Sequence, residues 1–321
     1  MFRKSDVRPK ALVIAIVSLG LVAGISVAPS SAAPKNLARA VVQTDWLEKN
    51  LDNPDVKIIE VSTEAGLYER GHIKNAVKFN WYTDLVEVVN RDIVSRTRFE
   101  KLARAAGINK NSTVVLYGDK NNWFAAWGAW IFNTYGIEDV RLVDGGRVKW
   151  ERDGRAFTSV VPSPKAGNFV AKPADRSIRA TLNQDVLPAV RKKGTVDMVD
   201  IRSADEYSGK IFAPAGFQEL AVRAGHIPGA ENIAWGLNVN SDGTFKTVAE
   251  LKKLYADKGI DGTKSIITYC RIGERSSLTW FVLSEILGYN DVKNYDGSWT
   301  EYGNSVGAPI SNPAGTVWGA Q

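Results

Sequence analysis

The stretch Gly225-His226-Ile227-Pro228-Gly229-Ala230 repeats the earlier stretch Gly71-His72-Ile73-Lys74-Asn75-Ala76, which lies 154 positions before it. Three more pairs stand 152 positions apart: Gly107-Ile108 and Gly259-Ile260, Leu116-Tyr117 and Thr268-Tyr269, Asp144-Gly145-Gly146 and Asp296-Gly297-Ser298. A nearly constant offset over separate landmarks indicates a duplicated domain. We place the two copies at residues 37–157 and 177–315. The proline-containing linker between them, residues 158–176, is predicted to be extended and exposed.

Strand and helix patterns alternate in each copy. In the second copy, the apolar runs at 196–199 and 265–269 predict buried strands, and the periodic runs at 248–258 and 277–287 predict helices. This alternation predicts an α/β fold in which each copy is a mainly parallel sheet flanked by helices. Ligands of such sheets bind beyond the carboxyl ends of the strands. Cys270 follows the strand at 265–269 directly.

Residues 1–33 have the pattern of a secretory signal peptide. Four basic residues precede an uncharged apolar run over residues 11–28, and small residues follow at 30–33. We therefore expect an exported protein, either secreted or held in the periplasm or cell envelope, with no stable membrane insertion after cleavage. An uncleaved anchor is the alternative, because the run is about long enough to span a bilayer.

The composition is that of a globular protein, with 44% hydrophobic and 24% charged residues among 321. The formal net charge of +6 comes partly from residues 1–33. No block of five or six like charges follows, so nucleic-acid binding is not favoured. A small excess of positive charge suits a small anionic substrate. We expect the protein to be a monomer.

Cys270 is the only cysteine, so it is either a buried apolar residue or a free reactive thiol. It opens a short loop between a strand and a helix, whose backbone N–H groups can form an anion-binding nest. Gly273 supplies backbone freedom, and Ser276 or Ser277 is the expected N-cap. A thiol at such a helix start should ionise below its ordinary pKa of about 8.5.

The loop Cys270-Arg271-Ile272-Gly273-Glu274-Arg275, with Asp200-x-Arg202 and the repeated Gly-His-Ile element, resembles a tandem-domain rhodanese, that is, a thiosulfate sulfurtransferase of the bacterial exported type. The resemblance covers nearly all of residues 37–315 and implies two rhodanese-like domains. It implies a persulfide on Cys270, loaded from thiosulfate with release of sulfite. The sulfur then passes to cyanide or another thiophilic acceptor, and no cofactor is expected.

The resemblance also implies the roles of the residues around Cys270, the nucleophile. The loop from Arg271 to Ser276 would surround the anionic donor; its members are Arg271, Ile272, Gly273, Glu274, Arg275 and Ser276. Arg202 is a second candidate contact to the anion, with an ion pair to Asp200 or Glu206 as the alternative. Arg271 favours thiosulfate over mercaptopyruvate. The negative charge of Glu274 leaves a mercaptopyruvate-type donor open.

The first copy lacks this chemistry. Gly118 stands where the second copy has Cys270, and Ser62 stands opposite Arg202. His72 and His226 occupy equivalent positions in both copies, so structural hydrogen bonds are expected of them. With two histidines and one cysteine, a metal site is poorly supported. The loop over residues 209–223 is longer only in the second copy, where it is expected to shape the pocket or contact the first copy.

Two other functions fit parts of the pattern. Small phosphatases and arsenate reductases also place a cysteine in an anion-binding loop, but their loops run C-x5-Arg, whereas Arg275 comes one residue earlier here. A non-enzymatic alternative is an exported sulfur-binding or redox-partner module that holds a persulfide without turnover.

Overall fold

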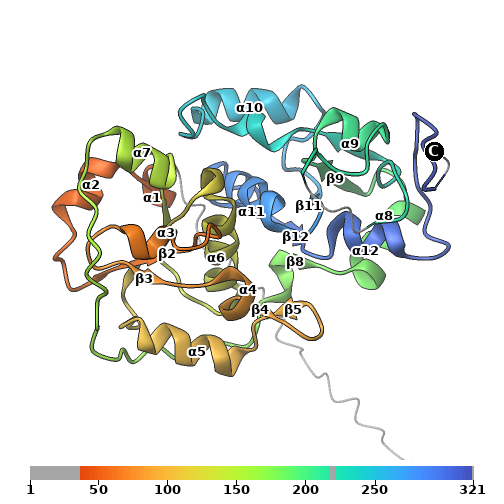
Figure 1. Cartoon of the computed structure of the whole chain (residues 1–321). Helices are drawn as coiled ribbons and strands as arrows, with labels where there is room; N and C mark the ends of the chain where they lie inside the picture. Colours follow the sequence, from red (N-terminus) through yellow and green to blue (C-terminus); the bar gives the residue numbers. More distant parts are fainter. Residues whose placement is uncertain (1–36, 217–220, 320–321) are drawn as a thin grey trace, which may run out of the picture. The chain divides into compact units, whose positions relative to one another are not determined.

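The computed structural model describes residues 37–216 and 221–319 of the chain (Figure 1). The predicted signal segment, residues 1–33, and residues 217–220 of the predicted long loop lie outside the described residues. Among the residues described, no helix combines the length and the apolar composition needed to cross a membrane.

The first copy is built on a parallel five-stranded sheet of order β1-β7-β6-β2-β3. Its strands are β1 (Val41–Val42), β2 (Val56–Glu60), β3 (Val77–Lys78), β6 (Thr113–Tyr117) and β7 (Val140–Val143). Its helices are α1 (Leu37–Ala40), α2 (Thr44–Lys49), α3 (Leu67–Arg70), α4 (Trp81–Asp84), α5 (Arg96–Ala105), η1 (Lys120–Asn122), α6 (Trp123–Thr134) and α7 (Gly146–Arg152). A small antiparallel hairpin, β4 (Val86–Glu87) with β5 (Asp92–Ile93), precedes α5.

The second copy repeats this sheet, with the order β8-β12-β11-β9-β10 when read from the same edge, again all parallel. Its strands are β8 (Arg179–Ala180), β9 (Val196–Asp200), β10 (Ala230–Asn232), β11 (Ser265–Tyr269) and β12 (Val292–Tyr295). Its helices are η2 (Arg176–Ile178), η3 (Leu182–Val186), α8 (Leu187–Arg191), α9 (Ala204–Ser208), η4 (Trp235–Asn238), α10 (Val248–Ala256), α11 (Glu274–Phe281), η5 (Val282–Ile286) and α12 (Ser298–Asn304). The predicted duplication and parallel sheets are confirmed.

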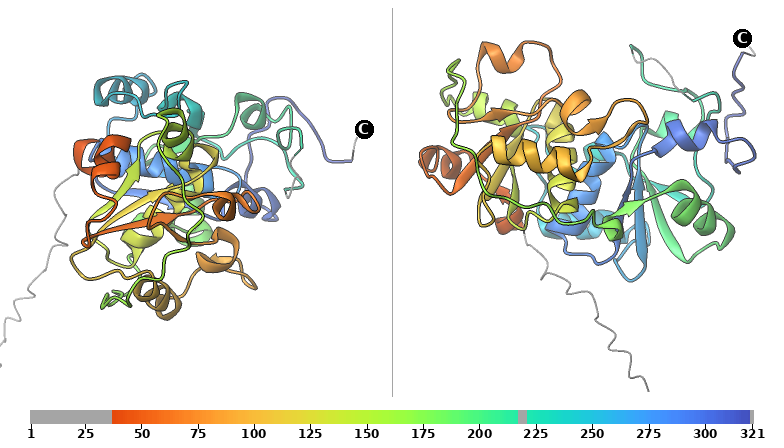
Figure 2. Two further views of the ribbon diagram at one scale, coloured as in Figure 1. Left: turned by 60° about the vertical axis from the view of Figure 1, so that its left-hand side comes forward. Right: turned by 90° about the horizontal axis from the view of Figure 1, so that it is seen from below.

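Helices cover both faces of each sheet, as the left view of Figure 2 shows for α2 and α5 of the first copy. The reason is the alternation of side chains along buried strands. In the first copy Ile58 and Val115 pack with Leu47 of α2, whereas Ile59 and Leu116 pack on the opposite face with Phe99 of α5.

The two copies meet through α6 and α11, which pack against each other (Figure 1). Helix α6 reads WFAAWGAWIFNT and is buried over nearly its whole circumference. A helix that is apolar all round has to be covered on every side, and α6 is covered by its own sheet and by α11. One apolar cluster therefore runs continuously through both copies and includes Cys270.

The linker is extended, as predicted, but only partly exposed. Residues 159–175 form no helix or strand. Phe169 is buried, and its ring packs edge-on against Phe99. Arg104 donates from Nε to the Phe169 carbonyl at 2.7 Å. The linker is therefore tied to α5 of the first copy, which composition alone did not indicate.

Candidate active site

The Cys270 loop joins β11 to α11 at the carboxyl end of the sheet, as predicted. Helix α11 begins at Glu274, and its N-cap is Gly273, whose φ is 98°. The expectation that Ser276 or Ser277 caps this helix is therefore wrong. Both serines lie in the first turn, and their hydroxyls donate to the Gly273 carbonyl at 3.0 and 2.8 Å.

Only glycine fits at position 273. Its φ lies in the left-handed region, which side chains other than glycine rarely adopt. A Cβ atom there would also lie 2.6 Å from the Trp127 ring of the first copy and 2.8 Å from the Asp296 backbone. The tight turn that aims the loop N–H groups at Cys270 therefore depends on this residue.

The start of α12 holds the loop from the other side. The backbone N–H of Cys270 donates to Ser298 Oγ at 3.1 Å, while Trp299 N–H donates to the Cys270 carbonyl at 3.0 Å. Thr300 N–H donates to the Arg271 carbonyl at 2.9 Å. Sequence reasoning missed these contacts, although Ser298 belongs to the repeated landmark at 296–298.

The Cys270 thiol is fully buried. Gly273 N–H donates to its sulfur at 3.0 Å, and the thiol donates to Glu274 Oε2 at 3.4 Å. Burial raises the pKa of Cys270 and Glu274 raises it further, while Arg275 and the hydrogen bonds from Ser276 lower it without reversing the shift. The expectation of a lowered thiol pKa is therefore wrong, because burial and the adjacent carboxylate outweigh the nest.

Arg275 lies within this cluster but is already paired. Its guanidinium donates to both oxygens of Glu206 at 3.3 Å, and its Nε lies 3.6 Å from Glu274 Oε1. The guanidinium also lies 6.0 Å from the Trp123 ring of the first copy. Burial alone would lower the pKa of Arg275, but Cys270, Glu206 and Glu274 raise it. The site thus holds a permanent cation beside the thiol.

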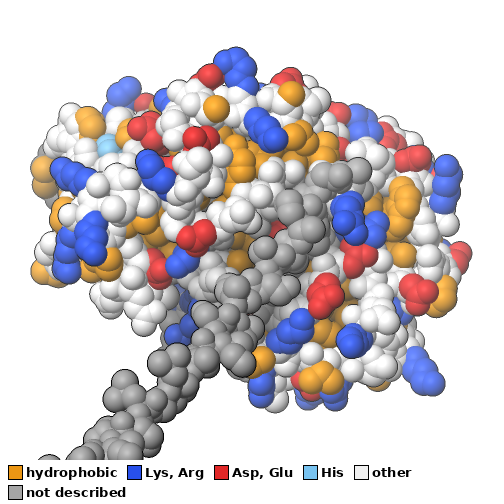
Figure 3. Space-filling model, turned by 180° about the vertical axis from the view of Figure 1, so that it is seen from behind, with side chains coloured by type: hydrophobic (Ala, Val, Ile, Leu, Met, Phe, Trp, Pro, Cys, Tyr) orange, Lys and Arg blue, Asp and Glu red, His pale blue; other side chains and the backbone are white. Residues whose placement is uncertain are grey.

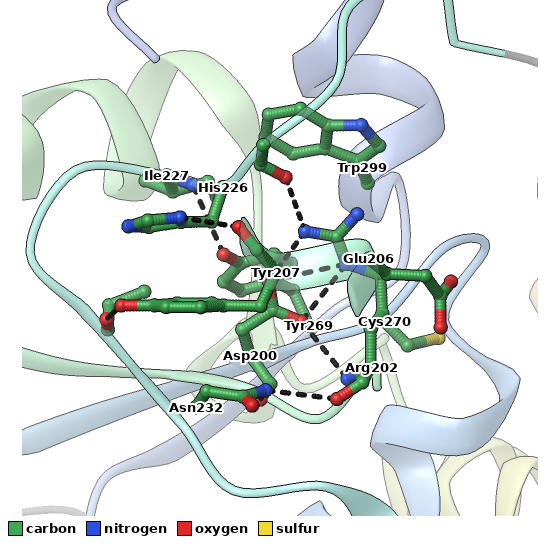
Figure 4. Close-up of polar contacts among 12 residues, drawn as sticks. Asp200, Arg202, Glu206, Tyr207, His226, Ile227, Asn232, Tyr269, Cys270 and Trp299 are labelled. Atoms are coloured by element: carbon green, nitrogen blue, oxygen red, sulfur yellow. Dashed lines mark hydrogen bonds and ion pairs between the residues drawn. The ribbon is translucent and has the colours of Figure 1, made fainter. Parts of the chain in front are cut away.

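Arg202 forms the ion pair with Asp200 that was the alternative to a donor contact. Its Nε and Nη2 donate to Asp200, and Nη2 also donates to the Gly225 carbonyl at 2.7 Å. The guanidinium lies 4.7 Å from the centre of the Trp299 ring, and 1% of the residue is exposed. In Figure 4 the side chains of Cys270 and Glu206 extend to the same side, and Arg202 is enclosed by Asp200 and Trp299. Through these contacts Arg202 stabilises the end of β9, which lies beneath the site.

The first copy contributes a contact to the same loop. Arg91, in the hairpin between β4 and β5, donates from Nη2 to the Ile272 carbonyl at 2.6 Å. Its guanidinium lies 5.7 Å from the Trp81 ring and 5.6 Å from the Trp127 ring. Arg91 and Ile272 both line a groove of about 980 Å³. Arg91 could not be recognised from the sequence, because it lies 181 positions from Ile272 and meets it only in the folded chain.

The histidines are structural, as predicted. His72 Nδ1 contacts the Tyr68 carbonyl at 2.9 Å and its ring stacks on Tyr68, and His226 repeats both contacts with Tyr207 (Figure 4). Within residues 37–216 and 221–319, no group of three or more histidine, cysteine, aspartate or glutamate side chains could hold a metal ion.

The described part of the long loop contacts the end of α12. Arg223 donates to four carbonyls at or beyond the end of this helix, those of Tyr302, Gly303, Ser305 and Ala308. Cations at the carboxyl end of a helix stabilise its unpaired carbonyls. Because the other end of α12 holds the Cys270 loop, Arg223 supports the site indirectly.

Comparison with known proteins identifies the family. The model of the rhodanese-like domain matches residues 43–153 and again residues 183–305. The chain belongs to the rhodanese family. It is 52% identical over 271 residues to a protein of Mycolicibacterium smegmatis that is provisionally named a thiosulfate sulfurtransferase; the match covers 84% of this chain and 96% of that one.

Two further relatives show the range of this rhodanese family. The chain is 50% identical over 274 residues to the sulfur carrier protein TtuD of Thermus thermophilus, a match covering 84% of this chain and 96% of that one. The crystal structure of SseA from Escherichia coli, described as a 3-mercaptopyruvate sulfotransferase, superposes with a TM-score of 0.69 and 27% identity, covering 81% of this chain and 98% of that one. The protein is therefore a member of a sulfurtransferase family with two rhodanese-like domains.

In the first rhodanese-like domain the loop after β6 is filled by its own side chains. Gly118 N–H donates to Asn122 Oδ1 at 3.0 Å, and Asn122 Nδ2 donates to the Val143 carbonyl at 2.7 Å. Asp119 accepts from the N–H groups of Thr63 and Glu64. Asn122 thus links Gly118, which stands where the second domain has Cys270, to the end of β7.

Proposed function

We propose that this rhodanese is a thiosulfate sulfurtransferase that carries sulfane sulfur as a persulfide on Cys270. The observation that carries the proposal is the placement of the Cys270 sulfur at the carboxyl end of β11, 3.0 Å from the N–H of Gly273 and beside the cation of Arg275. An N–H donor and a fixed cation stabilise an anionic sulfur more than a neutral one.

Sulfur would be transferred in two steps. The Cys270 thiolate attacks the outer sulfur of thiosulfate, a new S–S bond forms, the S–S bond of thiosulfate breaks, and sulfite leaves with that electron pair. In the second step cyanide or another thiophile attacks the terminal sulfur of the persulfide, which regenerates the thiolate. Arg271 and Arg275 contribute positive charge to the loop around the anionic donor, and the backbone of Ile272 and Gly273 forms its turn.

Intact mass spectrometry tests this function. Incubation with thiosulfate should add one sulfur atom to the wild type, and cyanide should remove it with formation of thiocyanate. Mercaptopyruvate serves as the competing donor, because a structural relative is described as acting on it. No added mass with either donor would contradict the proposal.

A second candidate is a sulfur carrier that is loaded but does not turn over with small acceptors. The relative from Thermus thermophilus that is named a sulfur carrier favours it. Steady-state thiocyanate production separates the two, since a carrier reacts once and stops. We also propose export through the segment at residues 1–33, which amino-terminal sequencing of the mature protein would test.

A further inference from the structure

The carboxylate of Glu274 contacts the sulfur of Cys270. The thiol donates to Glu274 Oε2 at 3.4 Å, whereas the other groups hydrogen-bonded to the sulfur, Gly273 N–H and Ser276, are donors. Only 5% of Glu274 is exposed, so water does not readily compete for this contact. We propose that Glu274 is a catalytic residue that accepts the proton of the Cys270 thiol and so generates the nucleophile.

The charges around the loop allow this proton transfer within a buried site. Arg275 contacts Glu274 at 3.6 Å and Glu206 at 3.3 Å, and Cys270 acts on Arg275 electrostatically. When the proton moves from sulfur to carboxylate, the negative charge moves from one neighbour of Arg275 to another. The number of buried charges does not change, which avoids the cost of burying a new unpaired charge.

Apart from η5, which carries Glu285, the elements packed on α11 bring few charged groups to it. Helix α6 and η4, which both pack on α11, contain no charged residue. On the side of β12 and α12, Asp296 is held by Arg179 at 2.9 Å, and Lys293 by Asp185 at 2.8 Å. Arg91 and Arg271 flank the loop as permanent cations. Glu274 is thus the acceptor in contact with the sulfur.

The role of Glu274 rests on the proposed function, and it explains how a buried thiol is converted to the nucleophile. Burial holds Cys270 in its neutral form, since its pKa is raised. Glu274 removes the proton as thiosulfate is attacked. It returns the proton to the departing sulfite, which leaves as bisulfite, and the carboxylate is restored. No oxidant or reductant is needed, because sulfane sulfur is transferred without a change of oxidation state.

The variant Glu274→Gln separates this role from a purely electrostatic one, because the two predict opposite changes. Removing a negative charge beside the thiol favours the thiolate, so an electrostatic role predicts faster persulfide formation. Loss of a general base predicts slower formation, by about 10²–10⁴-fold at neutral pH. Glu274→Asp should recover part of the rate. Glu231→Gln, an exposed carboxylate in the same domain, is the matched control.

Persulfide formation is followed in a single turnover by rapid mixing with saturating thiosulfate between pH 5.5 and 9, quenching and intact mass. Alkylation by iodoacetamide under the same conditions reports the thiolate directly. An unchanged or faster rate in Glu274→Gln would overturn the proposal. If that variant does not fold, the wild-type profile decides: a rate that levels off near neutral pH supports a base, and a rate that rises about tenfold per pH unit up to the thiol pKa overturns it. Failure of the wild type to gain sulfur at all would count against the proposed function instead.

Discussion

The two rhodanese-like domains share a sheet order but differ in the loop after the central strand. In the second domain only Gly273 has a positive φ in this loop, and its N–H donates to the Cys270 sulfur. In the first domain Lys120, Asn121 and Asn122 all have positive φ, and Asn122 bonds the N–H of Gly118. The first N–H of the loop is bonded in both domains, because Cys270 N–H donates to Ser298 Oγ. The difference shows that the shared sheet supplies the position, whereas the loop sequence determines whether an N–H group faces a cysteine sulfur there.

Beneath both loops lies the same support. In each domain a buried arginine pairs with the carboxylate that ends the second sheet strand, donates to the carbonyl of the glycine before the repeated histidine, and stacks on an aromatic ring. In the second domain it is Arg202, with Asp200, Gly225 and Trp299. In the first it is Arg147, with Glu60, Gly71 and Phe157. The first domain, which has Gly118 where the second has Cys270, keeps this arrangement, so it serves the fold.

The largest expected effect is the loss of sulfur transfer in Cys270→Ser. The hydroxyl is nearly isosteric but is not ionised near neutral pH, so persulfide formation should fall to the detection limit while the thermal unfolding midpoint stays close to that of the wild type. Cys270→Ser combined with Gly118→Cys should not regain activity, because a Cβ at Gly118 would lie 2.2 Å from the Val61 carbonyl. Thiocyanate production by either variant would contradict the comparison of the two loops.

Much of this fold could be predicted from the sequence, because the duplication repeats glycine turns and apolar strands. The strand at 265–269 was predicted with its observed bounds, and that at 196–199 within one residue. The start of α11 was placed too late, because serines usually cap helices, whereas here Gly273 takes that position. Arg147 could not be recognised as the partner of Glu60, since 87 residues separate them. The thiol pKa was misjudged because burial is not visible in a local motif.

A second test asks whether Arg202 and Arg147 play equal roles. Removing one partner of a buried ion pair costs about 3–5 kcal/mol, so Arg202→Ala and Arg147→Ala should each lower the free energy of unfolding by a similar amount. Urea unfolding measures this, with Arg191→Ala, an exposed residue of α8, as the control. A stable Arg202→Ala protein whose only defect is a raised KM for thiosulfate would restore the donor-contact hypothesis.

The third prediction concerns the ion pair of Glu206 with Arg275, which has no counterpart in the first domain's loop. Burial raises the pKa of Glu206, but Arg275 and the Ser203 N–H together lower it by more, so the net shift of this pKa is downward. A carboxyl with a lowered folded pKa contributes stability above its unfolded pKa of about 4.3 and loses it as the pH falls through the folded value. Glu206→Gln should therefore cost about 1.5–3 kcal/mol at pH 7 and progressively less below pH 4.

Urea unfolding of the wild type and Glu206→Gln at several pH values measures this difference. Asp205→Asn is the control, because Asp205 lies next in sequence and pairs with Lys210 at the surface. A stability difference between wild type and Glu206→Gln that grows toward acid pH would show that the carboxyl does not stabilise the loop as an anion.

The smallest expected effect concerns Arg91, through which the first domain contacts the Cys270 loop. Its hydrogen bond to the Ile272 carbonyl is exposed, and its contacts with Trp81 and Trp127 are at a surface site. Such cation–π contacts contribute about 0.5–1 kcal/mol, so Arg91→Ala should lower stability only slightly.

The loop beside the groove would lose one restraint, and Cys270, which is fully buried, should become more accessible. We expect iodoacetamide to alkylate Cys270 several-fold faster in Arg91→Ala at pH 8, whereas Arg96→Ala, another exposed arginine of the first domain, should leave the rate unchanged. Equal alkylation rates in both variants and the wild type would mean that the first domain does not restrain access to the thiol.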